Sequence, residues 1–384
     1  MLSRVKASER ERKEGTGMKK LLAVVMAFTM TAAMLAGCGS SAGDSASTAS
    51  EVPAESQAGE SAAEETTAVT STAVESEAAS AEGEAASGSD TVYHIGICQL
   101  LQHEALDQAT LGFKDAMVEL LGEDRVEFDE QNASNDSATC VTIINQFVSE
   151  DVDLILANAT ASLQAAAQGT EEIPILGTSI TDYATALGIE DWTGTTGANI
   201  SGTSDLAPLE EQAAMLNELF PDAQTVGLLY CSAEPNSIYQ ADTIRGYLEE
   251  YGYTCEDYTF ADSNDLASVV TNAVSACDVI YVPTDNTAAA NTEVINNVCL
   301  PAGVPIIAGE QGICAGCGVA TLSISYYDIG YAAGEMAVDI LENGADISTM
   351  EIQSAPNVTK MYNEAICSEL GITIPDGYEA IAAE

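Results

Sequence analysis

Two stretches of this chain, Asp153 to Thr160 (DLILANAT) and Asp278 to Asp285 (DVIYVPTD), share one pattern of an acidic residue, an apolar run and a polar end. Short apolar runs bounded by polar residues are typical of strands buried in a parallel sheet. The same order of patterns recurs around each stretch, which predicts two similar halves. The other matching pairs are IGI at 95–97 with VGL at 226–228, and IPILG at 173–177 with VPIIA at 304–308.

Strand-like runs alternate with helical patterns from residue 92 onward, as expected for parallel sheets covered by helices on both faces. We therefore predict an α/β fold of two doubly wound lobes, with a cleft where the carboxyl ends of the strands face each other. The expected strands are 93–99, 126–129, 154–157 and 174–176 in one lobe, and 225–230, 254–260, 279–282 and 305–308 in the other.

The two predicted lobes are each discontinuous in sequence, so the chain crosses between them three times, near residues 205, 316 and 349. About 290 residues follow the N-terminal region, which is more than one core usually holds. The predicted lobes are 91–205 with 317–348 for lobe 1, and 206–316 with 349–384 for lobe 2.

The N-terminal region predicts export and a lipid anchor. Met18-Lys19-Lys20 leads an apolar run from Leu21 to Leu35, which is typical of a secretory signal. The run ends in Leu-Ala-Gly-Cys38, which resembles a bacterial lipobox, so we expect a signal peptide over 1–37 that starts at Met18, and a lipidated Cys38. The alternative, an uncleaved membrane helix, would need about 20 apolar residues. Residues 38–90 are rich in Ser, Ala and Glu, as in a disordered linker.

The charge of the chain excludes nucleic acid as a partner. It has 60 acidic and 11 basic residues, a formal net charge of −49, and such a surface repels phosphate backbones. The sequence also lacks a GxxxxGK[ST] loop, an HExxH helix and a GxSxG elbow. We expect no catalysis, no cofactor and no metal site.

The cysteines leave one chemical alternative open. Nine remain besides Cys38, an odd number that does not define a disulfide framework. Cys314 and Cys317 form a single CxxC, which fits a disulfide or free thiols. A thiol oxidoreductase that uses this pair is the enzymatic alternative.

Two strand-end loops are candidates for ligand contacts. Thr160 and Ser162 open a helix after the strand 154–157, where free N–H groups suit a carboxylate. In the other half, Asp285 and Asn286 occupy the matching position and could accept hydrogen bonds from an ammonium group. Both loops also fit plain helix capping.

Several motifs resemble the ABC transporter substrate-binding proteins of the tryptophan/tyrosine type, which have the type I periplasmic-binding fold. The resemblance covers residues 93–375. The matching residues are Gln99 and His103 of Q-x-x-x-H, Asp153–Thr160, Thr181-Asp182, Asn199–Gly202, Glu234–Ser237 (EPNS), Tyr281–Asn286 (YVPTDN) and Tyr326–Gly330.

The resemblance implies a monomer that closes around an aromatic or other apolar amino acid and delivers it to an ABC permease and its ATPase at the outer face of the cell membrane. A ligand-sensing receptor component is the alternative without transport. Tyr183 and Glu104 replace family prolines. The ligand-binding residues that the resemblance implies are Gln99, Leu100, Thr160, Ser162, Asp182, Ser237, Asp285, Asn286 and Glu310.

Overall fold

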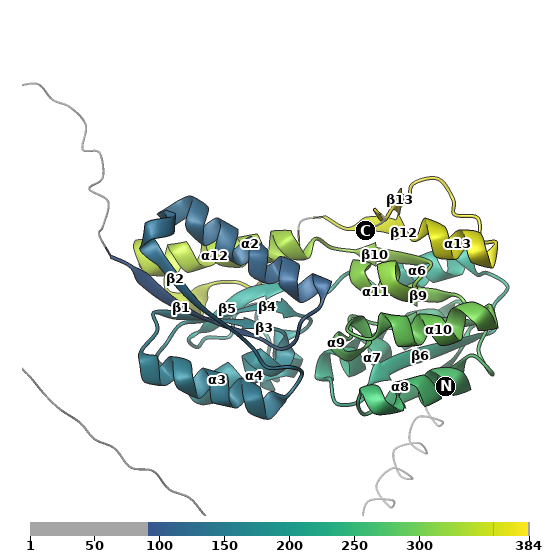
Figure 1. Ribbon diagram of the computed structural model, residues 1–384, viewed down its shortest axis with the longest axis horizontal. Helices are drawn as coiled ribbons and strands as arrows, with labels where there is room; N and C mark the ends of the chain where they lie inside the picture. Colours follow the sequence, from purple (N-terminus) through teal and green to yellow (C-terminus); the bar gives the residue numbers. More distant parts are fainter. Residues whose placement is uncertain (1–90, 356, 383–384) are drawn as a thin grey trace, which may run out of the picture. The chain divides into compact units, whose positions relative to one another are not determined.

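The computed structural model describes residues 91–355 and 357–382, which form two sheets with helices on both faces (Figure 1). The expected signal peptide, Cys38 and the linker lie outside the described residues. Within the described residues, no helix is both long and apolar enough to span a membrane.

The first sheet has the strand order β11-β5-β4-β3-β1-β2, and all its neighbouring strands are parallel. Its strands are β1 (Tyr93–Gln99), β2 (Val126–Asn132), β3 (Leu154–Asn158), β4 (Ile175–Ile180), β5 (Ile200–Ser204) and β11 (Gln353–Ser354). The helices of this lobe are α2 (Glu104–Leu121), α3 (Ser137–Glu150), α4 (Thr160–Gly169), α5 (Tyr183–Leu187) and α12 (Tyr326–Asn343), with short 3-10 turns at Glu123–Arg125 and Ile347–Thr349.

The second sheet has the order β13-β12-β10-β9-β8-β6-β7, and only the β10–β12 pair is antiparallel. Its strands are β6 (Thr225–Cys231), β7 (Thr254–Phe260), β8 (Val279–Val282), β9 (Ile306–Ala308), β10 (Ala320–Ser323), β12 (Thr359–Tyr362) and β13 (Glu379–Ala380). Its helices are α6 (Leu209–Leu219), α7 (Pro235–Glu250), α8 (Ser263–Ala273), α9 (Asn286–Ala289), α10 (Thr292–Ala302), α11 (Gln311–Cys317) and α13 (Glu364–Leu370).

The predicted likeness of the two halves is confirmed by the topology. The five main strands run 5-4-3-1-2 in one sheet and 10-9-8-6-7 in the other, so β6 to β10 repeat the order of β1 to β5. The matching sequence stretches at 153–160 and 278–285 fall on the equivalent strands β3 and β8. The fold class predicted from the sequence is therefore correct.

Two of the predicted crossover positions are wrong. Strand β10 is hydrogen-bonded to β9 and β12, so residues 320–323 belong to the second sheet and not to lobe 1. Strand β11 pairs with β5, so residues 353–354 belong to the first sheet. The chain therefore changes sheet after β5, between β10 and α12, and between β11 and β12. An apolar run fits either sheet, and only its hydrogen-bonded neighbours decide which.

The central strand β3 of the first sheet is apolar on both faces because both faces are covered. Leu154 and Leu156 of β3 pack with α2 and α12, whereas Ile155 and Ala157 pack with α3 and α4. Figure 1 shows α2 and α12 on one side of the strands and α3 and α4 on the other. Burial on both faces explains why the sequence shows continuous apolar runs and not alternation.

Glycines let α2 and α12 approach each other closely. A Cβ on Gly112 would lie 2.1 Å from the carbonyl oxygen of Tyr327, and a Cβ on Gly330 would lie 2.0 Å from that of Ala109. Both neighbours are helix backbone, which cannot move aside without breaking the helix. Since α12 begins directly after a crossover, this contact fixes the crossover relative to lobe 1.

We predict that Gly330→Ala lowers the free energy of unfolding by about 3 kcal/mol or more, because the new methyl group overlaps the α2 backbone. Urea denaturation measures the change. The matched control is Gly246→Ala in α7, where a Cβ meets nothing within 4 Å, and which should raise stability by up to about 1 kcal/mol. Equal effects of the two substitutions would contradict the close-packing argument.

Candidate functional site

A small cavity lies between the two lobes, at the carboxyl ends of their strands. Its volume is about 10 Å³, enough for roughly one water molecule. An amino acid can enter only if the lobes or their side chains move apart. The cavity is lined by His103, Leu106 and Ser179 from lobe 1, by Asp205 and Tyr326 at the crossovers, and by Asn236, Thr284, Asp285, Asn286, Ala289 and Glu310 from lobe 2.

Hydrogen bonds join the lobes around this cavity. His103 Nε2 lies 3.2 Å from Asn286 Oδ1, and Asn135 Nδ2 donates to Thr287 Oγ1 at 3.0 Å. On another side, Gln240 of α7 donates to Thr181 Oγ1 at the end of β4, over 3.3 Å. These three contacts connect α2, α3 and β4 with α9 and α7, so the lobes are held in a closed arrangement.

The Glu234 carboxylate positions the lobe 2 side of the cavity. Its Oε2 accepts hydrogen bonds from Asn286 N at 2.9 Å and Nδ2 at 2.8 Å, and its Oε1 accepts from Thr287 N at 2.9 Å and Oγ1 at 2.7 Å. Four donors on one carboxylate hold the start of α9 against the start of α7. The two residues that it binds are those that contact lobe 1.

Three further carboxyl groups line the cavity, and each is tied to its own element. Asp285 caps α9 through Ala288 N and also accepts from Cys231 N, at 2.8 and 2.7 Å. Glu310 caps α11 through Gly312 N and Ile313 N. Asp205 accepts from Thr181 Oγ1 and from Tyr326 OH, both at 3.0 Å, so it connects two of the crossovers.

Burial favours the protonated form of these carboxyl groups. It raises the pKa of Asp285 to about 8, with a further contribution from the nearby charge of Glu234. It also raises the pKa of Glu310 to about 7 and that of Asp205 to about 6. Burial acts in the opposite direction on His103, whose pKa it lowers. Near neutral pH the cavity therefore contains carboxyl groups close to their titration midpoints.

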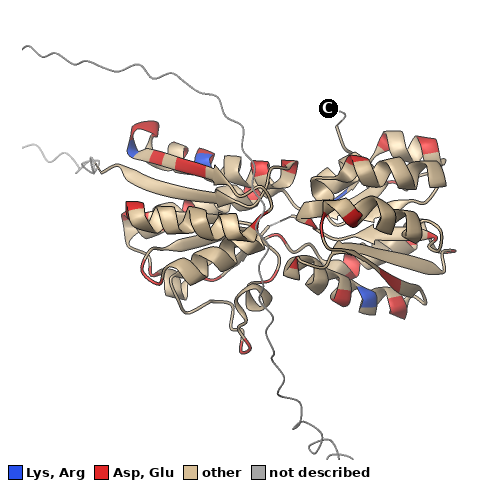
Figure 2. Ribbon diagram, turned by 60° about the horizontal axis from the view of Figure 1, so that its bottom comes forward, with Lys and Arg blue, Asp and Glu red and all other residues tan. Residues whose placement is uncertain are grey.

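The lysine and arginine side chains of the described residues do not pair with the carboxyl groups of the cavity. Of the described residues, only Lys114, Arg125, Arg245 and Lys360 carry such side chains, and each forms an ion pair elsewhere, with Glu130, Glu342, Asp257 and Glu218, respectively. Figure 2 shows how few these basic residues are among the many acidic ones. Among the described residues that line the cavity, none is Lys or Arg.

Ser179 enters the cavity from an irregular turn in β4. The β4–β5 register shifts between Gly177 and Ile180, and Ser179 has a φ of 57°, which is unusual for a residue other than glycine. Tyr183 holds this turn, since its buried hydroxyl lies within hydrogen-bond distance of the carbonyl oxygens of Gly177 and Thr203, at 3.0 and 3.1 Å. The Ser179 side chain is buried, and its Oγ has no hydrogen-bond partner among the described residues.

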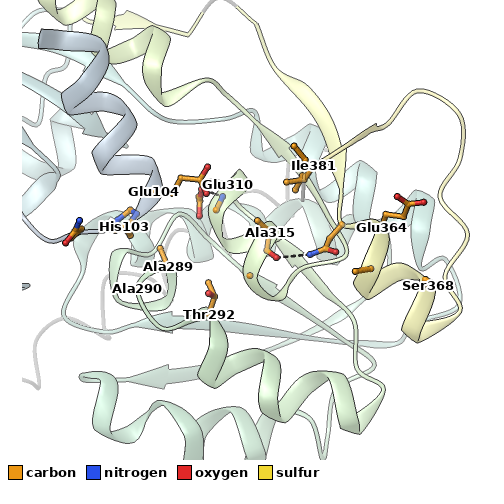
Figure 3. Close-up of a pocket in the computed structure, with 16 residues that line it drawn as sticks. His103, Glu104, Ala289, Ala290, Thr292, Glu310, Ala315, Glu364, Ser368 and Ile381 are labelled. Carbon is orange, nitrogen blue, oxygen red and sulfur yellow. Dashed lines mark hydrogen bonds between the residues drawn. The ribbon is translucent and has the colours of Figure 1, made fainter. Parts of the chain in front are cut away.

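A larger groove of about 920 Å³ lies beside the cavity and shares His103, Ala289 and Glu310 with it. Figure 3 shows Glu104 and Glu310 close together at the start of α2, with α13 and the C-terminal residues on the far side of the groove. The groove and the cavity therefore adjoin at these three residues.

The structure brings together only part of the predicted ligand-binding set. Asp285, Asn286 and Glu310 line the cavity, and Ser237 lies behind them, hydrogen-bonded to Asp285. Thr160 is buried at the start of α4, and Asp182 caps α5 through Thr185 N at 2.7 Å. The contacts of these two residues with a ligand stay predictions.

The other predicted residues face the interior of lobe 1. Gln99 donates a hydrogen bond to Asp107 at 2.7 Å and accepts one from Thr110 at 2.6 Å. Leu100 belongs to the apolar core of the lobe. Ser162 lies 3.6 and 3.7 Å from the Sγ atoms of Cys98 and Cys140. Strand-end position alone does not tell which way a side chain points, and here all three turn inward.

Several residues that line the cavity were not predicted from the sequence. His103, Asn236 and Thr284 lie within motifs quoted for the resemblance, so the motifs themselves were a usable signal. Ser179 and Asp205 belong to none of the motifs quoted for the resemblance. Ser179 reaches the cavity through a bulge that has no recognisable sequence pattern, and the crossover predicted near residue 205 did not indicate that the Asp205 side chain lines the cavity.

The CxxC pair is not a disulfide in the structure. Cys314 and Cys317 are buried free thiols in α11, and Cys317 Sγ donates to Ile313 O at 3.3 Å. Burial raises the pKa of both thiols well above the ordinary value, so neither is activated as a thiolate. Among the described residues, no cluster of potential ligands could hold a metal ion.

The sequence of this chain is similar to those of substrate-binding proteins. Residues 94–384 match the model of a family described as ABC transporter substrate binding protein. A relative from Clostridioides difficile (strain R20291), named tyrosine-binding protein, is 34% identical over 273 residues, which cover 71% of this chain and 79% of the relative.

Two solved structures each match 76% of this chain and all of their own. An ABC domain from Streptococcus pneumonia in complex with L-Trp is 31% identical and has a TM-score of 0.72. A substrate binding protein with adhesive properties from Clostridium difficile, in its ligand-free, open form, is 34% identical and has a TM-score of 0.60.

The buried carboxyl groups predict a dependence of stability on pH. An acid with a raised pKa binds its proton more tightly in the folded protein, so the free energy of unfolding falls as the pH rises from the unfolded pKa through the folded one. For Glu310 this window runs from about 4.5 to about 7. We expect Glu310→Gln to reduce the loss of stability between pH 5 and pH 8, as measured by thermal unfolding.

The matched control is Glu364→Gln, which changes an exposed carboxyl group at the start of α13. This variant should follow the parent protein across the pH range. A pH profile of Glu310→Gln that is parallel to that of the parent would contradict the assignment.

Proposed function

Because this chain belongs to the ABC transporter substrate binding protein family, we propose that it binds a free amino acid of the aromatic class between its two lobes, by similarity to the ligands named for its relatives.

 

The observation that carries this proposal is the cavity between the strand ends of both lobes, which is closed by hydrogen bonds from His103 and Asn135 to α9. The relatives named above include one called tyrosine-binding and one in complex with L-Trp, which supports an aromatic ligand.

We assign the two charged ends of an amino acid to two different sets of groups. The carboxyl groups that line the cavity suit the ammonium group. The start of α4 has no side-chain cap, so its N–H groups suit the ligand carboxylate. Backbone donors are needed there because no Lys or Arg lines the described cavity.

We infer that the lobes open and close around the crossovers to admit the ligand. The similarity to the L-Trp complex is greater than that to the ligand-free, open structure, although the open structure has the higher sequence identity. Sequence divergence does not account for the lower TM-score of the open structure, because that structure has the higher identity. A different arrangement of the two lobes does account for it. Ligand would then stabilise the closed state to the extent that it binds that state more tightly.

The proposed setting is that of a lipoprotein outside the cell membrane, anchored through Cys38, which delivers its ligand to an ABC permease and ATPase. The export signal and the lipobox at the N-terminus support this setting. A catalytic role for Cys314 and Cys317 is disfavoured, because both thiols are buried and their pKa values are raised.

We predict that an aromatic amino acid stabilises the protein after it has been refolded to remove any bound ligand. A ligand at about 100 times its Kd adds about 2.7 kcal/mol to the free energy of unfolding. Thermal unfolding in the presence of each of the twenty amino acids measures the effect, and we expect shifts with Tyr, Trp or Phe. If none of the twenty amino acids shifts the transition, the proposed ligand class is wrong.

We also predict that His103→Ala weakens ligand binding about five- to tenfold, because it removes a hydrogen bond that holds the lobes closed and is worth about 1 kcal/mol. Small-angle X-ray scattering should show a more open ligand-free protein. The control is His94→Ala, since the His94 side chain is largely exposed and faces Glu127 on the neighbouring strand. Equal effects of the two substitutions would exclude a role for His103 in closure.

A further inference from the structure

Glu310 and Asp205 face the same cavity, although they come from different parts of the chain. Their residues are only 3% and 5% exposed, the charge of Asp205 acts on Glu310, and the charges of both act on Tyr326. The other titratable groups around them are Asp285 at the start of α9, Glu104 of α2, His103 at its start, Tyr183 of α5, and the buried thiols Cys314 and Cys317 of α11. None of these neighbours supplies a permanent positive charge.

The carboxyl oxygens of both residues keep room for one more donor. Each oxygen of Asp205 accepts one hydrogen bond, from Thr181 or Tyr326, and each oxygen of Glu310 accepts one backbone N–H. A carboxylate oxygen has two lone pairs, so each can accept another hydrogen bond. Asp285 likewise accepts one backbone N–H on each oxygen, but it has a further hydrogen bond with Ser237, and the nearby charge of Glu234 acts on it.

Ser179 gives independent evidence that this side of the cavity receives a polar group. Its residue is only 6% exposed, it lines the same cavity, and its Oγ has no partner among the described residues. A buried hydroxyl without a partner destabilises the protein, because it has given up its hydrogen bonds to water and gained none in return. The positive φ of Ser179 adds backbone strain, and strain of this kind is concentrated at ligand sites.

We propose that Ser179, Asp205 and Glu310 form the ammonium subsite of the cleft, and that an ammonium group that enters this subsite drives a proton off the two carboxyl groups. This inference rests on the proposed function, because it assigns the amino end of the ligand to these residues and not to Asp285 and Asn286. An ammonium group donates three hydrogen bonds and has no lone pair, which matches a hydroxyl and two carboxylates.

The exchange balances in atoms and charge. A protonated carboxyl group releases H⁺ to solvent and becomes a carboxylate, which accepts an N–H of the incoming ammonium group. In the ligand-free protein the proton lowers the charge of the closed cleft, where burial raises the pKa of Glu310 to about 7 and that of Asp205 to about 6. In the complex the positive charge of the ammonium group lowers the charge of the closed cleft in place of the proton.

The test is isothermal titration calorimetry at pH 6 with three probes: L-tyrosine, tyramine, which lacks the carboxylate, and 3-(4-hydroxyphenyl)propionate, which lacks the ammonium group. Each titration is run in phosphate and in Bis-Tris, whose protonation enthalpies differ, so the difference in heat counts the protons released. We expect L-tyrosine and tyramine to release about one proton per molecule bound, and the propionate to release none.

The pH dependence gives a second readout. Neither the ammonium group of tyrosine nor its carboxylate titrates between pH 5.5 and 7, so any change in Kd comes from the protein. We expect the affinity to rise with pH, by up to about tenfold per unit below the pKa of the carboxyl group that loses its proton. Glu310→Gln should reduce both this slope and the proton count, while Glu364→Gln should leave both unchanged.

Ser179→Ala keeps the assignment testable if Glu310→Gln, which alters the cap of α11, does not fold. It removes only the hydroxyl, and it should weaken L-tyrosine and tyramine binding about tenfold without a similar effect on the propionate.

The possible outcomes separate the two proposals. Binding of L-tyrosine without proton release and without a pH-dependent Kd would overturn the subsite and leave the proposed function standing. If the thermal screen finds a different amino acid, that amino acid and its forms without the carboxylate or the amino group replace the three probes. If no amino acid binds, the proposed function and the subsite fall together.

Discussion

The hydrogen bonds of the Glu234 carboxylate are the constraint on which the rest of the site depends. This one side chain holds both the backbone and the side chains of Asn286 and Thr287. Those two residues in turn make the contacts with His103 and Asn135 of lobe 1. The closed arrangement of the lobes is therefore built on a buried carboxylate within lobe 2, and the donors to this carboxylate, which also include Asn236 Nδ2, offset the cost of its burial.

The crossovers are ordered by a second set of contacts. Asp205 lies just after β5 and accepts the hydroxyl of Tyr326, which begins α12 after another crossover. Farther along α12, Gly330 lets the helix lie directly against the backbone of α2. The first crossover is thus connected by a hydrogen bond to a helix that is rigidly packed on lobe 1. When the cleft opens, the chain must bend at the crossovers next to these contacts. The core of each lobe can stay unchanged.

The basic side chains and the carboxyl groups of the cavity lie in different parts of the described structure. The four described basic side chains form ion pairs with acidic groups away from the cavity, whereas the carboxyl groups of the cavity have only hydrogen-bond donors as partners. Exposed ion pairs of this kind contribute little to stability. The buried carboxyl groups have much larger effects, because desolvation changes the protonation state in which they are stable.

The sequence by itself determined the fold class, the two similar lobes and most strand positions, because burial on both faces of a parallel sheet requires continuous apolar runs that can be recognised in any context. It also pointed to Asp285, Asn286 and Glu310, which follow strands at the cleft edge. Only the tertiary structure decided which sheet β10 and β11 join, that Gln99 and Ser162 turn inward, and that Ser179 and Asp205 reach the cavity. Those outcomes depend on hydrogen-bonded neighbours, a β-bulge and chain crossovers, which are contacts between residues far apart in sequence and leave no local pattern.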